Sequence, residues 1–576
     1  MADMAESGSG SKLFVRQSSG LVRNVSVTNA LFFNVAAFVG VGLTLYTAFL
    51  TLAFVPVWRF AGLSEYGWAA IIAGVFFIFL SLIFASLVSV MPRSGGDYVF
   101  TSRIVHPFLG WMEGWTLVLA SVAIIAFEIP LVLRNLQITA RIIGIGAGGS
   151  FFKDANTWFT DSSGSITGTP GFIASLVVLA LIAGVVLLPT RSFHRFVTIL
   201  AAMGVAGFVL MFVFGLLATS GSDFQHNLPQ YTGGVTGHDI AKPAADLGYL
   251  PGTTDSFLSD VFSRTVFPFM LGIVFLNFIG FQYSAYISGE VRGNVKRGVM
   301  IALLGALAIG VFANSIFVDL LTRHFGFDTN IGWGLTYWGG TDLALPMGQP
   351  NSLPLLATVA NSSLWPVWAF ISFAGTVFPF LLCPVYINFI SRIGLAWSLD
   401  RQLPEWFGEV NERMRAPLNA ILATLGLTAI FLLLQNYSIL PSSIAPPVGK
   451  LNLVATLWFS IFMAALTWIM PGVNALLVGV RRPDLIRSAP FRRALPWLGL
   501  AWLVFPLWIY AFAAVKPIWE NLTGSGTGKL DYLNNTGITG TLIVTAIGVL
   551  IYIVMAVRNR RAGVDTSLLF AEIPPD

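Results

Sequence analysis

Few residues of this sequence could do chemistry, because polar groups are sparse within its long apolar stretches. The clearest set lies between Phe275 and Arg297, where an apolar run is interrupted at Ile279-Gly280 and then ends on charged residues. Irregular backbone at membrane depth is tolerated only where it is buried in protein or lines a wet cavity, because unpaired amides and carbonyls are costly in hydrocarbon. The interruption therefore predicts a place where a solute can contact the backbone.

A second interruption lies in the first apolar run, at Gly40-Val41-Gly42. Glycine inside a helix costs about 1 kcal/mol relative to alanine, so two glycines weaken the helix at one point. Paired interruptions in corresponding segments of inverted halves indicate a midplane binding site, and helix ends of this kind suit a carboxylate. The alternative is that these glycines only let helices pack closely.

Ionisable residues inside apolar runs are the other candidates, since intramembrane charges are costly and mark functional sites by default. Glu128 lies in the run SVAIIAFEIPLVL. Its carboxylate could accept a cationic group or carry a proton; alternatively it lies near the outer interface and pairs with Arg134. Glu290 and Arg292 follow the interrupted run, where they either form an inner gate or belong to a solvated helix end.

Membrane helices are the elements that must position these groups. Of the 576 residues, 56% are hydrophobic and only 10% are charged, whereas soluble domains carry about 25% charged residues. An all-α polytopic membrane protein is predicted, because a span needs about 20 apolar residues and twelve segments qualify. They lie near 29–56, 68–91, 108–145, 171–188, 195–219, 264–289, 297–322, 363–399, 417–434, 451–480, 496–516 and 537–558. The third and eighth are long enough to include an interfacial or protruding helix.

The distribution of lysine and arginine orients these spans. Most of the 32 basic residues fall in one set of alternating connections, and the positive-inside rule then places both termini in the cytoplasm of a multi-pass cell-membrane protein. The predicted organisation comprises a cytoplasmic tail, a first five-helix repeat, an extracellular loop, a second inverted five-helix repeat, helices 11 and 12, and a second cytoplasmic tail. These parts correspond to residues 1–28, 29–219, 220–263, 264–480, 481–558 and 559–576.

Four stretches resemble the amino acid, polyamine and organocation (APC) transporter family. MPRSGGDY at 91–98, with the following HPFLGW, is similar to the family's P-x-S-G-G-x-Y loop and its entry into span 3. The 275–297 stretch is similar to the family's interrupted span 6. SRIGLAWSLDRQLP at 391–404 with APLNA at 416–420, and RRPD at 481–484 leading to PFR at 490–492, resemble its later signatures. They occur in the family's order, and together they cover most of the chain.

The resemblance implies two inverted five-helix repeats plus two helices that alternate between outward-open and inward-open states. It also implies that the substrate meets the unwound parts of spans 1 and 6 and an aromatic residue of span 8. The corresponding residues here are Val39, Gly40, Val41, Gly42, Leu276, Asn277, Phe278, Ile279, Gly280 and Tyr386. Gly204 stands roughly where some proton-coupled relatives carry a lysine, so the choice between proton and sodium coupling stays open.

Transport is therefore the expected function: a secondary active transporter of amino acids or related organic amines. A polyamine or organocation exchanger of the same fold is the alternative, and an ion channel is disfavoured because no repeated filter loop is found. An enzyme is not expected, since the five histidines lack catalytic spacing. We expect no cofactor, no metal site around the single Cys383 and no nucleic-acid partner. The partners are the lipid bilayer and a small substrate, and the oligomeric state stays open.

Overall fold

The structure is a computed structural model of the 576-residue chain, and it is helical over most of the residues that it describes. These are residues 21, 23–40, 59–160, 168–246, 266–337, 352–437, 462–511, 515, 523, 538–564 and 566–571. Within them, eight helical segments are long and apolar enough to cross a membrane. The eight are Glu65–Val90, Pro107–Ala147, Thr169–Val186, Thr190–Leu217, Val295–Phe325, Ser362–Leu399, Leu418–Asn436 and Thr541–Arg561.

Four further predicted spans correspond to shorter apolar helices, so the count of twelve remains a prediction. These helices are α1 (Val27–Ala37), α13 (Val266–Asn277), α21 (Ala465–Arg481) and α23 (Leu495–Tyr510). The long helices are α4 (Glu65–Val90), α6 (Pro107–Ala147), α8 (Thr169–Val186), α9 (Thr190–Leu217), α14 (Val295–Phe312), α15 (Val318–Phe325), α18 (Trp365–Leu399), α19 (Leu418–Tyr437) and α25 (Ile538–Arg561). A π-helical turn, η5 (Ala313–Phe317), joins α14 to α15.

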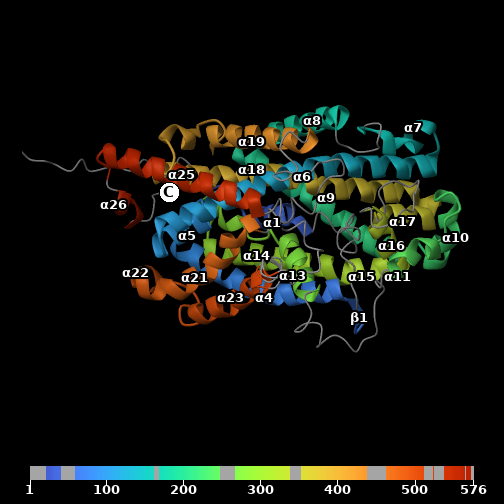
Figure 1. The fold of residues 1–576 in the computed structure, drawn as a ribbon, viewed down its shortest axis with the longest axis horizontal. Coiled ribbons are helices and arrows are strands. Elements are labelled where there is room, and N and C mark those ends of the chain that lie inside the picture. The colour runs from blue at the N-terminus through green and yellow to red at the C-terminus, as the bar shows by residue number, and fades with distance from the viewer. Residues whose placement is uncertain are drawn as a thin grey trace, which may run out of the picture.

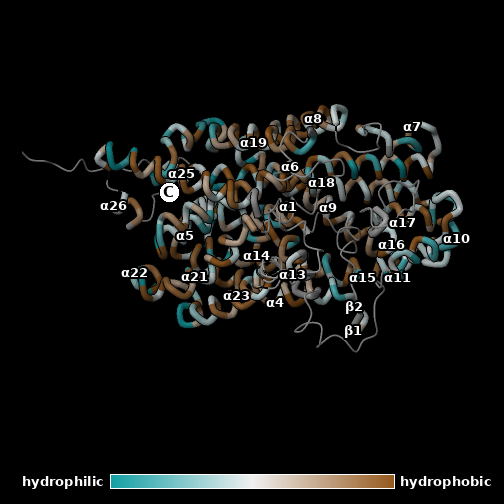
Figure 2. The backbone as a smooth tube through the Cα atoms, viewed as in Figure 1, coloured by the Kyte–Doolittle hydropathy of each residue, from teal (hydrophilic) through white to brown (hydrophobic). Residues whose placement is uncertain are grey.

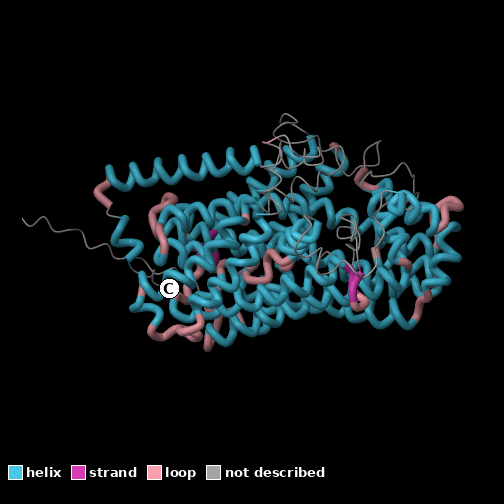
Figure 3. The backbone as a smooth tube through the Cα atoms, turned by 60° about the horizontal axis from the view of Figure 1, so that its bottom comes forward, coloured by secondary structure: helices cyan, strands magenta, loops and turns pink. Residues whose placement is uncertain are grey.

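Short elements connect these helices. The helical ones are α5 (Asp97–Ile104), α7 (Ser150–Lys153), α10 (Gly221–Tyr231), α11 (Gly237–Asp246), α16 (Phe327–Tyr337), α17 (Leu353–Ala360), α22 (Pro483–Ile486) and α26 (Thr566–Ala571), with 3₁₀ turns η1 (Ala155–Thr157), η3 (Tyr283–Ala285), η4 (Ser288–Glu290), η6 (Ser362–Leu364) and η7 (Glu405–Gly408). Two antiparallel strand pairs, β1 (Arg59–Phe60) with β2 (Leu63–Ser64) and β3 (Val410–Asn411) with β4 (Ala416–Pro417), lie apart along the molecule (Figure 3).

The molecule is elongated, and many of its long helices run along the long axis (Figure 1). One end carries α5, α22 and α26 and is called the α5 end here; the other carries α7, α10, α11 and α16 and is called the α10 end. Hydrophilic residues gather mainly at these two ends, and hydrophobic residues line the length between them (Figure 2). This is the distribution that a membrane-spanning protein requires.

Helices α6 and α18 pack extensively against each other and form the interior of the bundle. The most apolar stretch of α6 is completely buried, whereas that of α25 is almost entirely uncovered. Each of the two overlong predicted spans is one continuous helix. At 41 residues α6 is far longer than a hydrocarbon core requires, and its excess continues as the same helix rather than as a separate interfacial one. The predicted 220–263 loop contains α10 and α11 within its described part.

Candidate functional site

The first interruption begins where α1 ends. Ser26 caps the start of α1 by accepting a hydrogen bond from the Asn29 amide at 3.1 Å, and the helix ends at Ala37. Phe38 is extended, with φ −75° and ψ 102°. The described interruption is at Phe38, just before the predicted glycines; Val39 and Gly40 are helical again, and Val41 and Gly42 lie outside the described residues.

The second interruption follows Asn277, the last residue of α13. The chain continues through turns, and Gly280 adopts φ +99°, a conformation that L side chains rarely take. The rest of the predicted span is built from the 3₁₀ turns η3 and η4 rather than from a second α-helix. The predicted break at Ile279-Gly280 therefore coincides with the end of regular helix in this structure.

The two interruptions meet backbone to backbone. The Val39 amide donates a hydrogen bond to the Ile279 carbonyl at 3.1 Å. A Cβ atom on Gly40 would lie 2.9 Å from the Asn277 carbonyl oxygen, and one on Gly280 would overlap the carbonyl oxygen of Ala37. Both glycines are needed because the chains approach too closely for a side chain. All six of these residues are buried, together with the predicted site residues Leu276 and Phe278.

A buried polar network that the sequence analysis missed adjoins this junction. The Asn277 amide group donates to the Tyr66 hydroxyl at 2.8 Å, and that hydroxyl donates to the Asn314 side-chain oxygen at 2.5 Å. Tyr66 is in α4, and Asn314 is in the π-helical turn η5, a distortion frequently found at functional sites. Isolated amides within apolar runs were the sequence signal that could have marked Asn277 and Asn314 as candidates, but this signal does not show that they share a partner.

A second missed pair fixes the chain beyond the break. The Asn34 side chain of α1 donates to the Ser284 hydroxyl at 2.9 Å and accepts from the Ser284 amide at 2.7 Å. Ser284 belongs to η3, which has no α-helical hydrogen-bond ladder of its own. Contacts from α1 therefore hold this irregular segment in place.

Glu128 and Tyr386 lie close together, and Tyr386 contacts span 6 at η3, which follows the break at Gly280. Glu128 in α6 is 1% exposed, and its Oε1 atom has no hydrogen-bond partner among the described residues. It lies near Cys383 and Tyr386 of α18. The Tyr386 ring packs at 4.9 Å, centroid to centroid, against Tyr283 of η3. Glu128 is thus in the interior, and Arg134, its predicted interfacial partner, instead contacts Gln137 at 3.4 Å.

At the α5 end, a layer of buried ion pairs contacts the irregular part of span 6 that contains η3 and η4. The Arg392 guanidinium of α18 donates to both Glu290 oxygens, at 2.8 and 3.1 Å, and both side chains are fully buried. Glu290 is therefore not part of a solvated helix end. Arg292 is exposed and contacts the Arg23 carbonyl and Asn24. Arg392 lies 102 residues from its partner and was not among the site residues predicted from the sequence.

The 91–98 loop and α5 complete this layer. Asp400, which directly follows α18, accepts hydrogen bonds from Tyr98 at 2.7 Å and Arg103 at 2.6 Å. Asp97 accepts one from the Tyr286 hydroxyl at 2.5 Å. Burial raises the pKa of the Asp97 carboxyl to about 7, and the hydrogen bond from Tyr286 opposes that rise. This layer, formed by Asp97, Tyr98, Arg103, Tyr286, Glu290, Arg392 and Asp400, is called the ion-pair layer here.

The glycines of the same loop explain its close fit. A Cβ atom on Gly96, whose φ is +52°, would lie 2.5 Å from the Tyr286 ring, and the Gly95 amide donates to the Tyr286 carbonyl at 2.9 Å. Only glycine allows the loop to lie directly on the irregular segment. In α9, the Phe378 ring occupies the space beside Gly204, so a side chain there would collide with it.

Comparison with known proteins gives the same family as the sequence motifs. The family described as "Amino acid permease" matches residues 25–528 of the chain. The chain is also similar to the branched-chain amino acid permease BcaP of Lactococcus lactis subsp. cremoris (strain MG1363), with 25% identity over 479 residues that cover 81% of this chain and 87% of the relative. Because the family match covers most of the chain, the protein belongs to the amino acid permeases of the APC superfamily and is a multi-pass membrane protein.

Proposed function

We propose that this permease is a secondary active transporter that moves amino acids by alternating access and holds its substrate where the breaks of spans 1 and 6 meet. The observation that carries the proposal is the approach of two interrupted helices around Val39, Gly40, Ile279 and Gly280. Helix ends carry amide and carbonyl groups without intrahelical partners, and these complement the carboxylate and amine of an amino acid. We propose that the other site residues inferred from the sequence, including Val41 and Gly42, also line this substrate site.

The proposed substrates are neutral amino acids with branched apolar side chains. Val39, Leu276, Phe278 and Ile279 are buried beside the junction, so the surroundings favour an apolar side chain. The similarity to a branched-chain amino acid permease supports this choice.

Glu128 favours a second candidate, an organic cation or polyamine of the same transport class. A buried carboxylate oxygen without a hydrogen-bond partner in the described residues is costly, and an ammonium group near Tyr386 would offset that cost. In this candidate Tyr386 and Glu128 hold the amine, whereas the helix breaks hold the rest of the substrate.

The ion-pair layer is proposed as the inner gate, with Arg392 rather than Arg292 as the partner of Glu290. The α5 end then faces the cytoplasm, which accords with the arginines described there, among them Arg401, Arg558 and Arg561. We also propose that the protein lies in the cell membrane and that residues 29–219 and 264–480 form inverted repeats. Transport is proposed to be coupled to either a proton or sodium.

Uptake by the purified full-length protein in liposomes tests these assignments. We expect saturable uptake of labelled leucine that isoleucine and valine inhibit, driven by an imposed proton or sodium gradient. Uptake of arginine or putrescine with no leucine uptake would replace the first substrate class with the second. A conductance that does not saturate, with no exchange of labelled substrate, would overturn the transporter assignment.

A further inference from the structure

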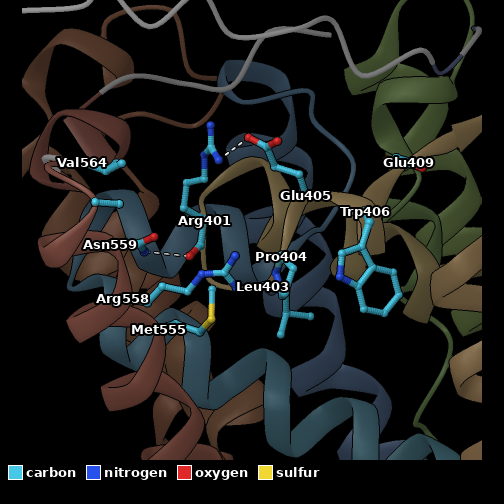
Figure 4. A pocket seen from close by; sticks show the side chains of 11 residues that line it. Arg401, Leu403, Pro404, Glu405, Trp406, Glu409, Met555, Arg558, Asn559 and Val564 are labelled. Atoms are coloured by element: carbon cyan, nitrogen blue, oxygen red, sulfur yellow. Dashed lines mark hydrogen bonds and ion pairs between the residues drawn. The ribbon is translucent and has the colours of Figure 1, made fainter.

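A cavity of about 390 Å³ lies at the α5 end, away from the junction of the helix breaks. Its walls come from the chain that follows α18, including Arg401, Pro404 and Trp406, and from the last turns of α25, including Arg558 and Asn559 (Figure 4). The Asn559 side chain donates to the Arg401 carbonyl at 2.9 Å, which fastens the two walls to each other. The cavity is therefore enclosed by two segments that are hydrogen-bonded to each other.

Arginine side chains dominate the chemistry of this cavity. The Arg558 guanidinium points into it (Figure 4), and within the described residues it has no ion-pair or hydrogen-bond partner. Arg401 forms an ion pair with Glu405, and Glu409 also lies on the lining. The Arg558 charge thus remains available to an anion, although two carboxylates restrict where that anion can lie.

An apolar groove continues from the cavity along α25. Ile553, Val554 and Val557 line a second hollow of about 370 Å³, and Arg558 and Arg561 stand at its head. Ile553 and Val554 are 52% and 55% exposed. Exposed aliphatic side chains on a span-length helix face hydrocarbon, so the groove opens to the lipid at the level where the apolar part of α25 ends.

We propose that this cavity and groove bind an anionic phospholipid of the adjacent leaflet. The head-group phosphate is held by Arg558 and Arg561, and one acyl chain lies along Ile553, Val554 and Val557. Guanidinium groups bind phosphate through paired, charge-assisted hydrogen bonds, and basic pockets at a membrane surface select acidic head groups. Trp406, which is 56% exposed, is the residue type that anchors a protein at this depth. The apolar groove favours a lipid over a free phosphate compound.

Such a lipid would act next to the ion-pair layer. Its cavity is walled by the chain that starts one residue after Asp400, and Asp400 binds Tyr98 and Arg103. A bound head group would therefore fasten α25 to the connection between α18 and α19, which contacts α5 through Asp400.

Lipid titration of the purified, delipidated full-length protein tests the proposal by native mass spectrometry. Arg558→Gln removes the charge in the cavity, and Arg560→Gln is the matched control because Arg560 lies outside both linings. We expect phosphatidylglycerol to bind the wild type about tenfold more tightly than Arg558→Gln, with Arg560→Gln within about threefold of the wild type. Phosphatidylcholine should bind weakly to all three proteins, and Arg558→Lys should recover part of the affinity.

Three outcomes would overturn the proposal. Equal losses in the Arg558→Gln and Arg560→Gln proteins would show general surface attraction, and equal binding of phosphatidylcholine would remove the charge argument. Inorganic phosphate or glycerol 3-phosphate that binds through Arg558 as tightly as phosphatidylglycerol would assign the cavity to soluble anions. Thermal unfolding of each variant checks that the fold is retained.

Discussion

The replacement Gly40→Ala tests directly whether the junction of the two helix breaks holds the substrate. The added Cβ atom would lie 2.8 Å from the Asn314 side-chain nitrogen and 2.9 Å from both the Asn277 carbonyl oxygen and its Cβ atom. Ordinary contacts of carbon with oxygen or carbon lie at about 3.3–4.0 Å. The two breaks must therefore separate by about 0.5–1 Å. Overpacking of this kind costs about 1–3 kcal/mol of conformational free energy at the junction. Because the substrate would bind only the undistorted junction, we expect this cost to appear as a loss of about 5- to 150-fold in affinity.

The matched control is Gly184→Ala in α8, where nothing lies within 4 Å of the added atom. Alanine is the better helix former, so this change should leave transport unaltered and stability equal or higher by up to about 1 kcal/mol. Leucine binding to purified protein and leucine uptake in liposomes are measured for both variants. Wild-type affinity and uptake in a correctly folded Gly40→Ala protein would refute the assignment of the junction as the binding site.

Three further changes probe the surroundings. Glu128→Gln should reduce uptake of cationic amines at least about tenfold and leave leucine uptake within about twofold, since only a cation gains from the carboxylate; equal effects on both classes would contradict this. Tyr66→Phe leaves the side chains of Asn277 and Asn314 without their shared partner, so a thermal-shift assay should show a loss of about 1–3 kcal/mol in unfolding free energy. Asp97→Asn tests the raised pKa. Because folding shifts the Asp97 pKa from 3.8 to about 7, the folded state binds the extra proton between these values. Stability contributed by Asp97 is therefore lost as the pH rises through about 7, and the variant should lack that part of the pH dependence of unfolding.

The break in span 6 could be predicted because its cause is local. Gly280 adopts a positive φ that glycine accepts without steric cost, and regular helix ends three residues earlier, at Asn277. In span 1 the described interruption comes at Phe38, before the predicted glycines, and its cause is tertiary. Regular α-helix ends at Ala37 because Val39 is bonded to Ile279, a residue of another span.

The ion pairs and the amide network were beyond prediction from one sequence. Glu290 pairs with Arg392, and Tyr66 links Asn277 to Asn314, through separations of 102 to 248 residues. Hydropathy assigns a residue to a span but carries no information about helix rotation or about which spans are neighbours. Arg292, two residues from Glu290 and named with it as an inner-gate candidate, is exposed, whereas the ion pair of Glu290 is formed with Arg392.

The irregular segment after Gly280 makes span 6 longer than a regular α-helix of the same residues would be. A 3₁₀ turn rises about 2.0 Å per residue and an α-helix about 1.5 Å, so the three residues of η3 and the three of η4 extend about 3 Å further than they would as α-helix. The hydrogen bonds between Asn34 and Ser284 of η3 and the ion pair of Glu290 in η4 hold span 6 at this extended length.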